Sequence, residues 1–321
     1  MGNAEANPNP SLPISRRTLL QGTGLALGGT ALANGTADAH PPGVPVPGPG
    51  SPVRPIPVPE QVPATQGLFQ VPGARLWYWD TGGPGEPVVL LHALSGSGES
   101  WPYQQRYLAR AGYRVIGYSR RGYTNSPVQD PNDPRTGIED LQDLVDFLGI
   151  RKFHVVGVAG GGWYAMDYAL NHPDRLHSLV IGACVLQVRE QDYQDMVERL
   201  RSPEVDALPI HFRELGPSYR AIDPDGVARW LDIHHRSGPD GIIQPRATSL
   251  SWAVIERLTV PTLLLWGDAD PHTSPPVQRL LAGHFRRVST VVANECGHNV
   301  HWERSDVVNP VLLNFFRANR R

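Results

Sequence analysis

The chain has 321 residues and a formal net charge of −2, and 40% of the residues are hydrophobic. Its 33 glycines and 32 prolines make up about a fifth of the chain, less than in collagens or disordered proteins, and the apolar residues suffice for a large core. Near-neutral charge disfavours a nucleic-acid partner. Two cysteines without paired Cys or His spacing disfavour a disulfide framework and a structural metal site.

Residues 1–39 resemble an export signal of the twin-arginine type. Arg16 and Arg17 precede an apolar run over residues 19–32 that is too short to span a bilayer as a helix. Small residues at 37–39 resemble a signal-peptidase site, and the segment has no cysteine for a lipid anchor. We expect an exported protein, periplasmic or extracellular, that meets the export machinery through this signal and has no stable membrane anchor. A chance arginine pair before a buried helix is the alternative.

Residues 40–66 are predicted to be a linker. Ten prolines and three glycines lie between residues 41 and 63, where Arg54 and Glu60 are the only charged residues. Because proline lacks a backbone N–H, neither a helix nor the interior of a sheet is expected there. The composition therefore predicts an extended, semi-rigid spacer between the export signal and the folded domain.

Strand and helix patterns alternate through residues 67–320. Residues 138–148 carry apolar side chains at helical spacing, with acidic residues on the opposite face. The pattern predicts an α/β domain with a mostly parallel, doubly wound sheet, whose functional loops follow the carboxyl ends of the strands. Short apolar runs typical of buried parallel strands lie at residues 88–91, 114–118, 154–157, 178–181, 262–266 and 288–292.

The first of these strands ends in a loop of small residues over 92–98. Such a loop can offer a backbone N–H to a developing oxyanion, together with the N–H of the residue that follows a nucleophile. The candidate donors are the backbone N–H groups of Leu94 and Gly160. A flexible turn without a catalytic role is the alternative interpretation.

A glycine-rich turn follows the strand at 154–157 and precedes a predicted helix. Gly157 and Gly161 flank Ala159 in the Gly-x-residue-x-Gly pattern of a nucleophile elbow, where a Cβ at either glycine would collide with backbone. A turn that closes a βα unit, with a phosphate at the helix N-terminus, is the alternative. The pattern makes Ala159 the candidate nucleophile position.

More than 70 residues without strand character separate the strand that ends near Cys184 from the strand that starts at Thr262. This is far longer than an ordinary loop, and residues 192–201 and 224–234 have helical patterns. We therefore predict a helical cap over about 186–258. Aromatic residues that could line a substrate pocket, although each alone is more often a packing residue, are Trp101, Trp163, Tyr193, Phe212, Tyr219 and Trp230.

A carboxylate and a histidine follow the last two predicted strands. Asp268 and Asp270 come directly after the strand at 262–266, and His298 follows the strand at 288–292. This is the chain order nucleophile, acid, base, in which the acid orients the imidazole and the imidazole relays protons. Asp268 is the alternative acid, or a brace of the same loop. Histidines expected to be structural are His154, His177 and His284.

Taken together, residues from about 68 to 316 resemble an α/β-hydrolase with a helical cap. Residues 118–126 resemble the family's arginine–glycine loop, and 138–150 resemble the helix and turn before the elbow strand. Gly267 with Asp270 resembles the acid motif, which favours Asp270 over Asp268. Gly297 and His298, followed by Trp302, Glu303 and the helical stretch at 311–316, resemble the base motif of hydrolases that act on ring-cleavage products.

Two residues depart from the family pattern. Ala93 stands where the family usually has glycine, which slightly narrows the oxyanion loop. Ala159 stands in place of the nucleophilic serine, and its methyl group cannot attack a carbonyl carbon, so the chain is expected to be inactive or nearly so as a serine hydrolase. The chain is either a deliberate Ser→Ala variant or a natural homologue without the covalent step. The deliberate variant is favoured because the elbow glycines, the acid and the base are all kept. The presence of the export signal is an argument against it, since a purified variant would normally lack the signal.

Three functions are compatible with these residues. The leading hypothesis is hydrolysis of a partly apolar ester, lactone or similar carbonyl compound without metal or organic cofactor. A serine at 159 would attack, His298 would act as base and then acid, and Asp270 would hold His298. The second is a catalytically silent protein whose capped pocket binds an apolar ligand. The third is a cofactor-free lyase or dioxygenase reaction run by His298 and Asp270.

The two cysteines are expected to be free, buried thiols. Cys184 should lie at a strand end and Cys296 near His298, and export to an oxidising compartment would permit a bridge. Spatial proximity cannot be deduced from their spacing, so a disulfide is the less favoured interpretation.

Overall fold

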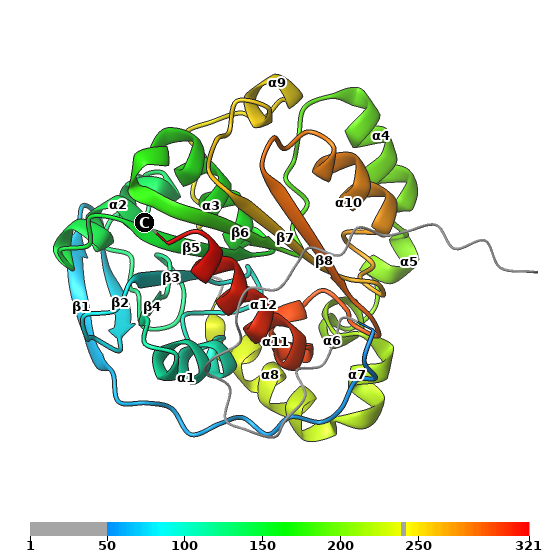
Figure 1. Ribbon diagram of the computed structural model, residues 1–321, viewed down its shortest axis with the longest axis horizontal. Helices are drawn as coiled ribbons and strands as arrows, with labels where there is room; N and C mark the ends of the chain where they lie inside the picture. The colour runs from blue at the N-terminus through cyan, green and yellow to red at the C-terminus, as the bar shows by residue number, and fades with distance from the viewer. Residues whose placement is uncertain (1–49, 239–241, 321) are drawn as a thin grey trace, which may run out of the picture. The chain divides into compact units, whose positions relative to one another are not determined.

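The computed structural model describes residues 50–238 and 242–320, which form an eight-stranded sheet with helices around it (Figure 1). The strand order is β1-β2-β4-β3-β5-β6-β7-β8; β1, β2 and β4 pair antiparallel and all other neighbours pair parallel. The predicted fold class is thus confirmed. The export signal and the first part of the predicted linker lie outside the described residues. The strands are β1 (Thr65–Val71), β2 (Ala74–Asp80), β3 (Pro87–Leu91), β4 (Arg114–Tyr118), β5 (Phe153–Val158), β6 (Leu176–Gly182), β7 (Thr262–Gly267) and β8 (Val288–Ala293).

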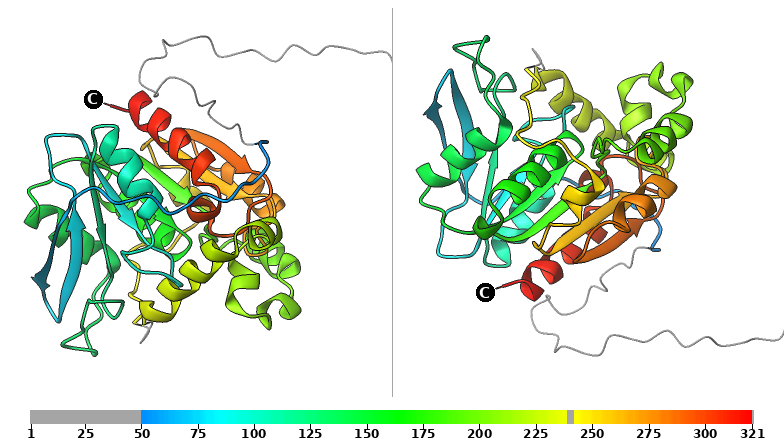
Figure 2. Two further views of the ribbon diagram at one scale, coloured as in Figure 1. Left: turned by 90° about the horizontal axis from the view of Figure 1, so that it is seen from below. Right: turned by 90° about the horizontal axis from the view of Figure 1, so that it is seen from above.

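Helices cover both faces of the sheet, as the two views of Figure 2 show. On one face, α1 (Pro102–Arg110), α11 (Val300–Glu303) and α12 (Ser305–Ala318) share a buried cluster with the sheet. On the other face, α2 (Gly137–Phe147), α3 (Gly160–Asn171) and α10 (Pro275–Ala282) contribute to a second cluster. This two-sided burial explains why the central strands are almost wholly apolar.

A helical cap lies between β6 and β7, as the sequence predicts. Buried Tyr219 and Trp230, from the cap, share a third apolar cluster with Tyr103 of α1 and Trp302 of α11. The cap is thus packed on the same helices that flank the end of the sheet. Among the described residues, no helix is both long and apolar enough to cross a membrane. The cap helices are α4 (Gln191–Leu200), α5 (Pro203–Asp206), α6 (Ile210–Glu214), α7 (Pro217–Ile222), α8 (Pro224–Ser237) and α9 (Trp252–Ile255).

Residues 50–64, which we call the N-terminal strap, form part of the predicted extended spacer and pack against the folded domain. Val53 is buried in the cluster that joins the cap to the core. Tyr103 Oη donates a hydrogen bond to the carbonyl oxygen of Ile56 at 2.9 Å, and Gln105 exchanges two hydrogen bonds with the backbone of Val62 at 2.9 and 3.1 Å. The valines and isoleucine between the prolines supply apolar contacts. The strap leads directly into β1, which begins inside the predicted linker.

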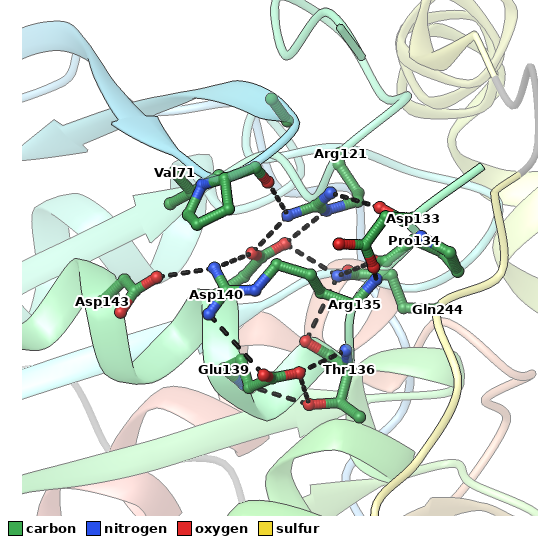
Figure 3. Close-up of polar contacts among 12 residues, drawn as sticks. Val71, Arg121, Asp133, Pro134, Arg135, Thr136, Glu139, Asp140, Asp143 and Gln244 are labelled. Carbon is green, nitrogen blue, oxygen red and sulfur yellow. Dashed lines mark hydrogen bonds and ion pairs between the residues drawn. The ribbon is translucent and has the colours of Figure 1, made fainter. Parts of the chain in front are cut away.

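A buried ion pair connects three segments of the core (Figure 3). Arg121, in the loop after β4, pairs with Asp140 of α2, with Nη2 and Oδ1 2.6 Å apart. Gln244, on the chain that returns from the cap, donates to the same carboxylate at 2.7 Å. The arginine–glycine loop and the helix before the elbow, which the sequence shows only as separate motifs, are therefore held together, and the cap's return segment is fixed to them.

Candidate active site

The parallel strands bring the predicted site loops to one edge of the sheet. Leu91 pairs with Gly157 and Gly267 pairs with Ala293, so β3, β5, β7 and β8 end at similar levels. The predicted oxyanion loop follows β3 and the elbow follows β5. The predicted acid follows β7 and the predicted base follows β8. The site is therefore assembled where an open α/β sheet places its ligands.

The turn between β5 and α3 has the backbone of a nucleophile elbow. Ala159 has φ 45° and ψ −120°, a conformation that costs an ordinary residue about 1–3 kcal/mol. A Cβ on Gly161 would lie 2.1 Å from the carbonyl oxygen of Leu91, and one on Gly157 would lie 2.3 Å from that of Gly161. Both glycines are required by close backbone packing. The elbow therefore keeps its geometry around a side chain that has no nucleophile.

The predicted acid and base lie in hydrogen-bond contact. His298 Nδ1 and Asp270 Oδ2 are 2.8 Å apart, and both residues are buried. Asp270 also accepts hydrogen bonds from the backbone N–H of His272 and Thr273 at 2.8 and 3.1 Å. Asp268 is exposed, and its Oδ1 accepts from the backbone N–H of Cys296 at 3.3 Å. Asp270 is therefore the carboxylate that orients His298, while Asp268 braces the loop.

The pair stabilises the ionised form of both groups. Burial alone would raise the pKa of Asp270, but the charge of His298 and the hydrogen bonds from His298 and Thr273 lower it to about 2. Burial alone would lower the pKa of His298, but the charges of Asp270 and Glu214 raise it to about 9. The pair therefore favours a protonated imidazole beside an ionised carboxylate more strongly than the two free groups would.

A buried arginine holds the oxyanion loop, and the sequence did not identify it. Arg120 donates to the carbonyl oxygens of His92 and Ala93, and its own backbone N–H donates to His92 Nε2 at 3.1 Å. These bonds fix the backbone that leads into Leu94. A Cβ on Gly160 would lie 2.5 Å from the Leu94 side chain, so the two candidate donor residues are neighbours. The adjacent arginine pair after β4 is the sequence signal for this role.

Glu303 holds the base loop (residues 297–303) from inside. Its Oε2 accepts from the backbone N–H of Gly297 at 2.9 Å and of Gly216 at 2.7 Å, and its Oε1 accepts from Asn299 N–H at 3.1 Å. Burial raises the pKa of this carboxyl to about 7, although these three hydrogen bonds oppose the shift. One carboxyl thus joins the base loop to the start of the cap helix α7. The sequence placed Glu303 in a motif but gave it no role.

A cavity of about 570 Å³ lies between α4 of the cap, the segment that follows β6 and Trp163 of α3. Of the six predicted pocket aromatics, Trp163 and Tyr193 line it. It is further lined by Val185, Gln187, Val188, Gln194, Val197, Glu198, Arg201 and His272. The ring of His272 packs edge-on against that of His298, with 4.7 Å between centroids. The cavity therefore borders His272, a neighbour of the acid–base pair.

The other four aromatics predicted to line a pocket do not line this cavity. Trp101 is 1% exposed and packs against His301, and Tyr219 and Trp230 belong to the cluster between cap and core. Phe212 is 45% exposed, with Arg220 over its ring. Aromatic type alone does not separate a packing residue from a lining residue, because both need apolar surface.

The remaining candidate residues have structural contacts. Cys184 and Cys296 are both buried and free, in agreement with the prediction. His154 is buried beside Ser178 Oγ at 2.8 Å, and His284 stacks on Trp252. Within residues 50–238 and 242–320, no group of three or more His, Cys, Asp and Glu side chains could hold a metal ion.

Comparisons with known proteins agree with this architecture. The model of the alpha/beta hydrolase family matches residues 88–311, more than half of the chain. A 2-hydroxy-6-oxononadienedioate/2-hydroxy-6-oxononatrienedioate hydrolase from Paraburkholderia xenovorans is 25% identical over 260 residues, covering 75% of this chain and 90% of that protein. A 2-hydroxy-6-oxo-6-phenylhexa-2,4-dienoate hydrolase from Comamonas testosteroni is 25% identical over 271 residues, covering 75% and 91%. A thermophilic esterase from Thermogutta terrifontis has a similar structure, with a TM-score of 0.65, 22% identity, and coverage of 81% of this chain and 100% of that one.

Proposed function

The chain belongs to the alpha/beta hydrolase family, and we propose that its capped site is built to hydrolyse an ester, lactone or similar carbonyl compound by a Ser-His-Asp mechanism, with Ala159 in the place of the nucleophilic serine. The observation that carries this proposal is the 2.8 Å contact between His298 and Asp270, at the same sheet edge as a turn with elbow backbone. Together these supply a proton relay and a fixed position for a nucleophile. The apolar lining of the cavity favours a partly apolar substrate.

Each residue of the site has a role in the proposed reaction. A serine at position 159 would attack the carbonyl carbon, and His298 would take its proton and pass it to the leaving group. Asp270 would orient His298, and the backbone N–H groups of Leu94 and Gly160 would bind the oxyanion. With Ala159 this covalent route is closed. Loss of the nucleophile in such a triad costs on the order of 10⁶-fold in kcat.

The test is to make Ala159→Ser in the full chain and assay short p-nitrophenyl esters and lactones. We expect a gain in kcat of at least about 10³-fold over the encoded chain, because a hydroxyl is added to a turn already shaped for it. Ala159→Gly is the matched control and should give no gain, and His298→Ala should remove the gain of Ala159→Ser. No gain from Ala159→Ser on any of these substrates would contradict the proposal.

Ala159 itself favours a second candidate, a ligand-binding protein without turnover. Tight binding of an apolar ligand by the encoded chain, with no turnover after Ala159→Ser, would support it instead. A lyase or dioxygenase reaction run by His298 predicts a third pattern, in which His298→Ala abolishes an activity that Ala159 leaves intact. Export to the periplasm or the extracellular space, based on residues 1–39, stays a prediction and is compatible with all three candidate functions.

A further inference from the structure

A carboxylate from the cap lies among the groups of the candidate site. Glu214 ends α6, and its Oε2 accepts hydrogen bonds from Asn299 Nδ2 at 2.9 Å and from Ser95 Oγ at 3.2 Å. Its main-chain oxygen accepts from the backbone N–H of His298 at 3.0 Å and of Asn299 at 3.1 Å. Glu214 therefore contacts both the base loop and the oxyanion loop, and the roles assigned above make no use of it.

The charge of Glu214 also acts on the candidate base. Its Oε1 lies 3.9 Å from Nε2 of His272, whose ring packs against His298. Glu214 adds to the effect of Asp270 in raising the pKa of His298 to about 9, against the opposite effect of burial. The titratable groups that face His298 are Asp270 and His272 from the acid loop, Glu214 from the cap, and His301 and Glu303 from α11.

These neighbouring charges favour the protonated form of His298. An imidazole whose pKa is raised by Asp270 and Glu214 donates a proton readily and accepts one less readily, so a second base beside it would serve a reaction of the encoded chain. Glu214 is a carboxylate with 12% of its side chain exposed, beside the loop that offers oxyanion donors. A fixed negative charge there would oppose a developing oxyanion. The opposition disappears if the carboxylate takes up a proton in the same step.

We propose that Glu214 is the general base of the encoded chain and that His298 is its general acid, so that water attacks the substrate directly. This inference rests on the proposed function, carbonyl hydrolysis in this site. It assigns a catalytic role to a cap residue and explains how a chain with Ala159 could turn over a substrate without an acyl-enzyme.

The atoms balance in two steps. A water molecule loses one proton to the Glu214 carboxylate while its oxygen bonds to the carbonyl carbon, and the carbonyl π electrons move to the oxygen held by the Leu94 and Gly160 N–H groups. The carbonyl then re-forms, the bond to the leaving oxygen breaks, and His298 gives its proton to that oxygen. The products are a carboxylic acid and an alcohol. Transfer of the proton from Glu214 to His298 through solvent restores the starting charges.

The test compares Glu214→Gln in two backgrounds, the encoded full chain and Ala159→Ser. Phenyl acetate is the probe, because its leaving phenolate needs a proton. In the encoded chain we expect Glu214→Gln to lower kcat about 10²-fold, the usual contribution of a general base, with little change in KM. In the Ala159→Ser background we expect it to raise kcat several-fold at pH 7, because a lower pKa of His298 frees more imidazole to act as base.

The opposite signs separate a catalytic role from a merely structural one. If Glu214 only held Ser95 and Asn299 in place, its substitution would lower turnover in both backgrounds, and that result would overturn the inference while leaving the proposed function intact. Glu204→Gln is the matched control on an exposed carboxylate of α5 and should change neither rate. A gain from Ala159→Ser with no turnover of the encoded chain would also overturn the inference. No turnover in either background contradicts the proposed function itself.

The pH profiles give a second, independent readout. Turnover by the encoded chain should fall as pH rises through about 9, because His298 loses the proton that it donates. Turnover by Ala159→Ser should rise over the same range, because its His298 must be neutral to accept a proton. Mass spectrometry should detect an acyl-enzyme in Ala159→Ser and none in the encoded chain. Profiles with the same slope, or an acyl-enzyme on the encoded chain, would overturn the inference.

Discussion

The elbow (residues 157–161) and the base loop (residues 297–303) lie at the same edge of the sheet but are held in different ways. The elbow is held by backbone contacts, with Gly157 and Gly161 packed against carbonyl oxygens. The base loop is held by side chains, since Glu303 bonds its backbone N–H groups and Asp270 bonds His298. The elbow can therefore lose its reactive side chain without losing its shape. The base loop cannot lose its polar side chains in the same way, because their hydrogen bonds hold its conformation.

The largest expected loss of stability comes from Gly161→Ala, which adds a side chain where the backbone of the elbow packs against the backbone of β3. The added Cβ would lie 2.1 Å from the Leu91 carbonyl oxygen, so β3 and α3 must separate, and we expect a loss of about 4 kcal/mol in the free energy of unfolding or a failure to fold. Urea unfolding followed by tryptophan fluorescence measures the loss. The loss should be independent of pH, because the elbow has no titratable group.

Gly283→Ala is the matched control for this substitution. Gly283 has φ −62°, and its added Cβ would make only ordinary contacts, the nearest at 3.4 Å from the Leu280 carbonyl oxygen. Its effect should stay within about 0.5 kcal/mol. If Gly161→Ala and Gly283→Ala unfold at the same urea concentration, backbone packing does not hold the elbow.

The base loop should instead show a stability that depends on pH. Glu303 has an ordinary pKa of 4.5 in the unfolded chain and about 7 in the folded protein, so the folded state binds the extra proton between these values. Stability should therefore fall as pH rises from 4.5 to 7, by on the order of 3 kcal/mol. Glu303→Gln removes this proton uptake. The measurement is the free energy of unfolding of both proteins at several pH values.

Exposed Glu204→Gln provides the reference. The hydrogen bond from Ser202 lowers the pKa of Glu204, so its own contribution is lost below pH 4.5 and the substitution should change the pH dependence between 4.5 and 7 little. The two curves for the unmodified chain and Glu303→Gln should diverge between pH 4.5 and 7. Parallel curves would show that Glu303 does not carry a raised pKa. The elbow and the base loop would then not differ in the pH dependence of their stability.

The smallest effect is expected from Val53→Ala in the N-terminal strap. Val53 packs in the cluster that contains Trp302, next to Glu303, so its truncation should cost about 1–2 kcal/mol. Hydrogen exchange should become faster in α11 than in the elbow, since the lost contact lies on the side of the base loop. Arg54→Ala, an exposed neighbour, should cost less than about 0.5 kcal/mol. Equal effects of the two substitutions would mean that the strap does not stabilise this region.

The parts of the site that depend on neighbouring residues are predictable from sequence. A buried strand followed by glycines around one residue predicts the elbow, and strands followed by Asp270 and His298 predict the acid and base. These motifs are local, and the parallel sheet then brings them together without further information. The cap was predictable for the same reason, because a long stretch without strand character stands between two clear strands.

The parts that were missed depend on contacts between distant residues. Glu214 lies 85 positions before Asn299, and its role depends on how the cap folds back onto the sheet. The composition of the strap predicts an extended spacer because proline content is local, whereas the contact of Ile56 with Tyr103 crosses 47 positions. Four of the six predicted pocket aromatics do not line the cavity, and the burial of Tyr219 and Trp230 among them is decided by their packing partners. No property of the individual residue distinguishes these cases.

The strained turn at Ala159 has a genetic consequence. Codons for alanine and serine of the GCN and TCN sets differ only in their first base, so one base substitution in such a codon would place a hydroxyl at the top of the elbow. Because Gly157 and Gly161 keep the turn in shape whichever of the two side chains is present, no compensating change would be needed. Loss and recovery of the nucleophile are thus single, reversible steps for a gene that encodes this fold.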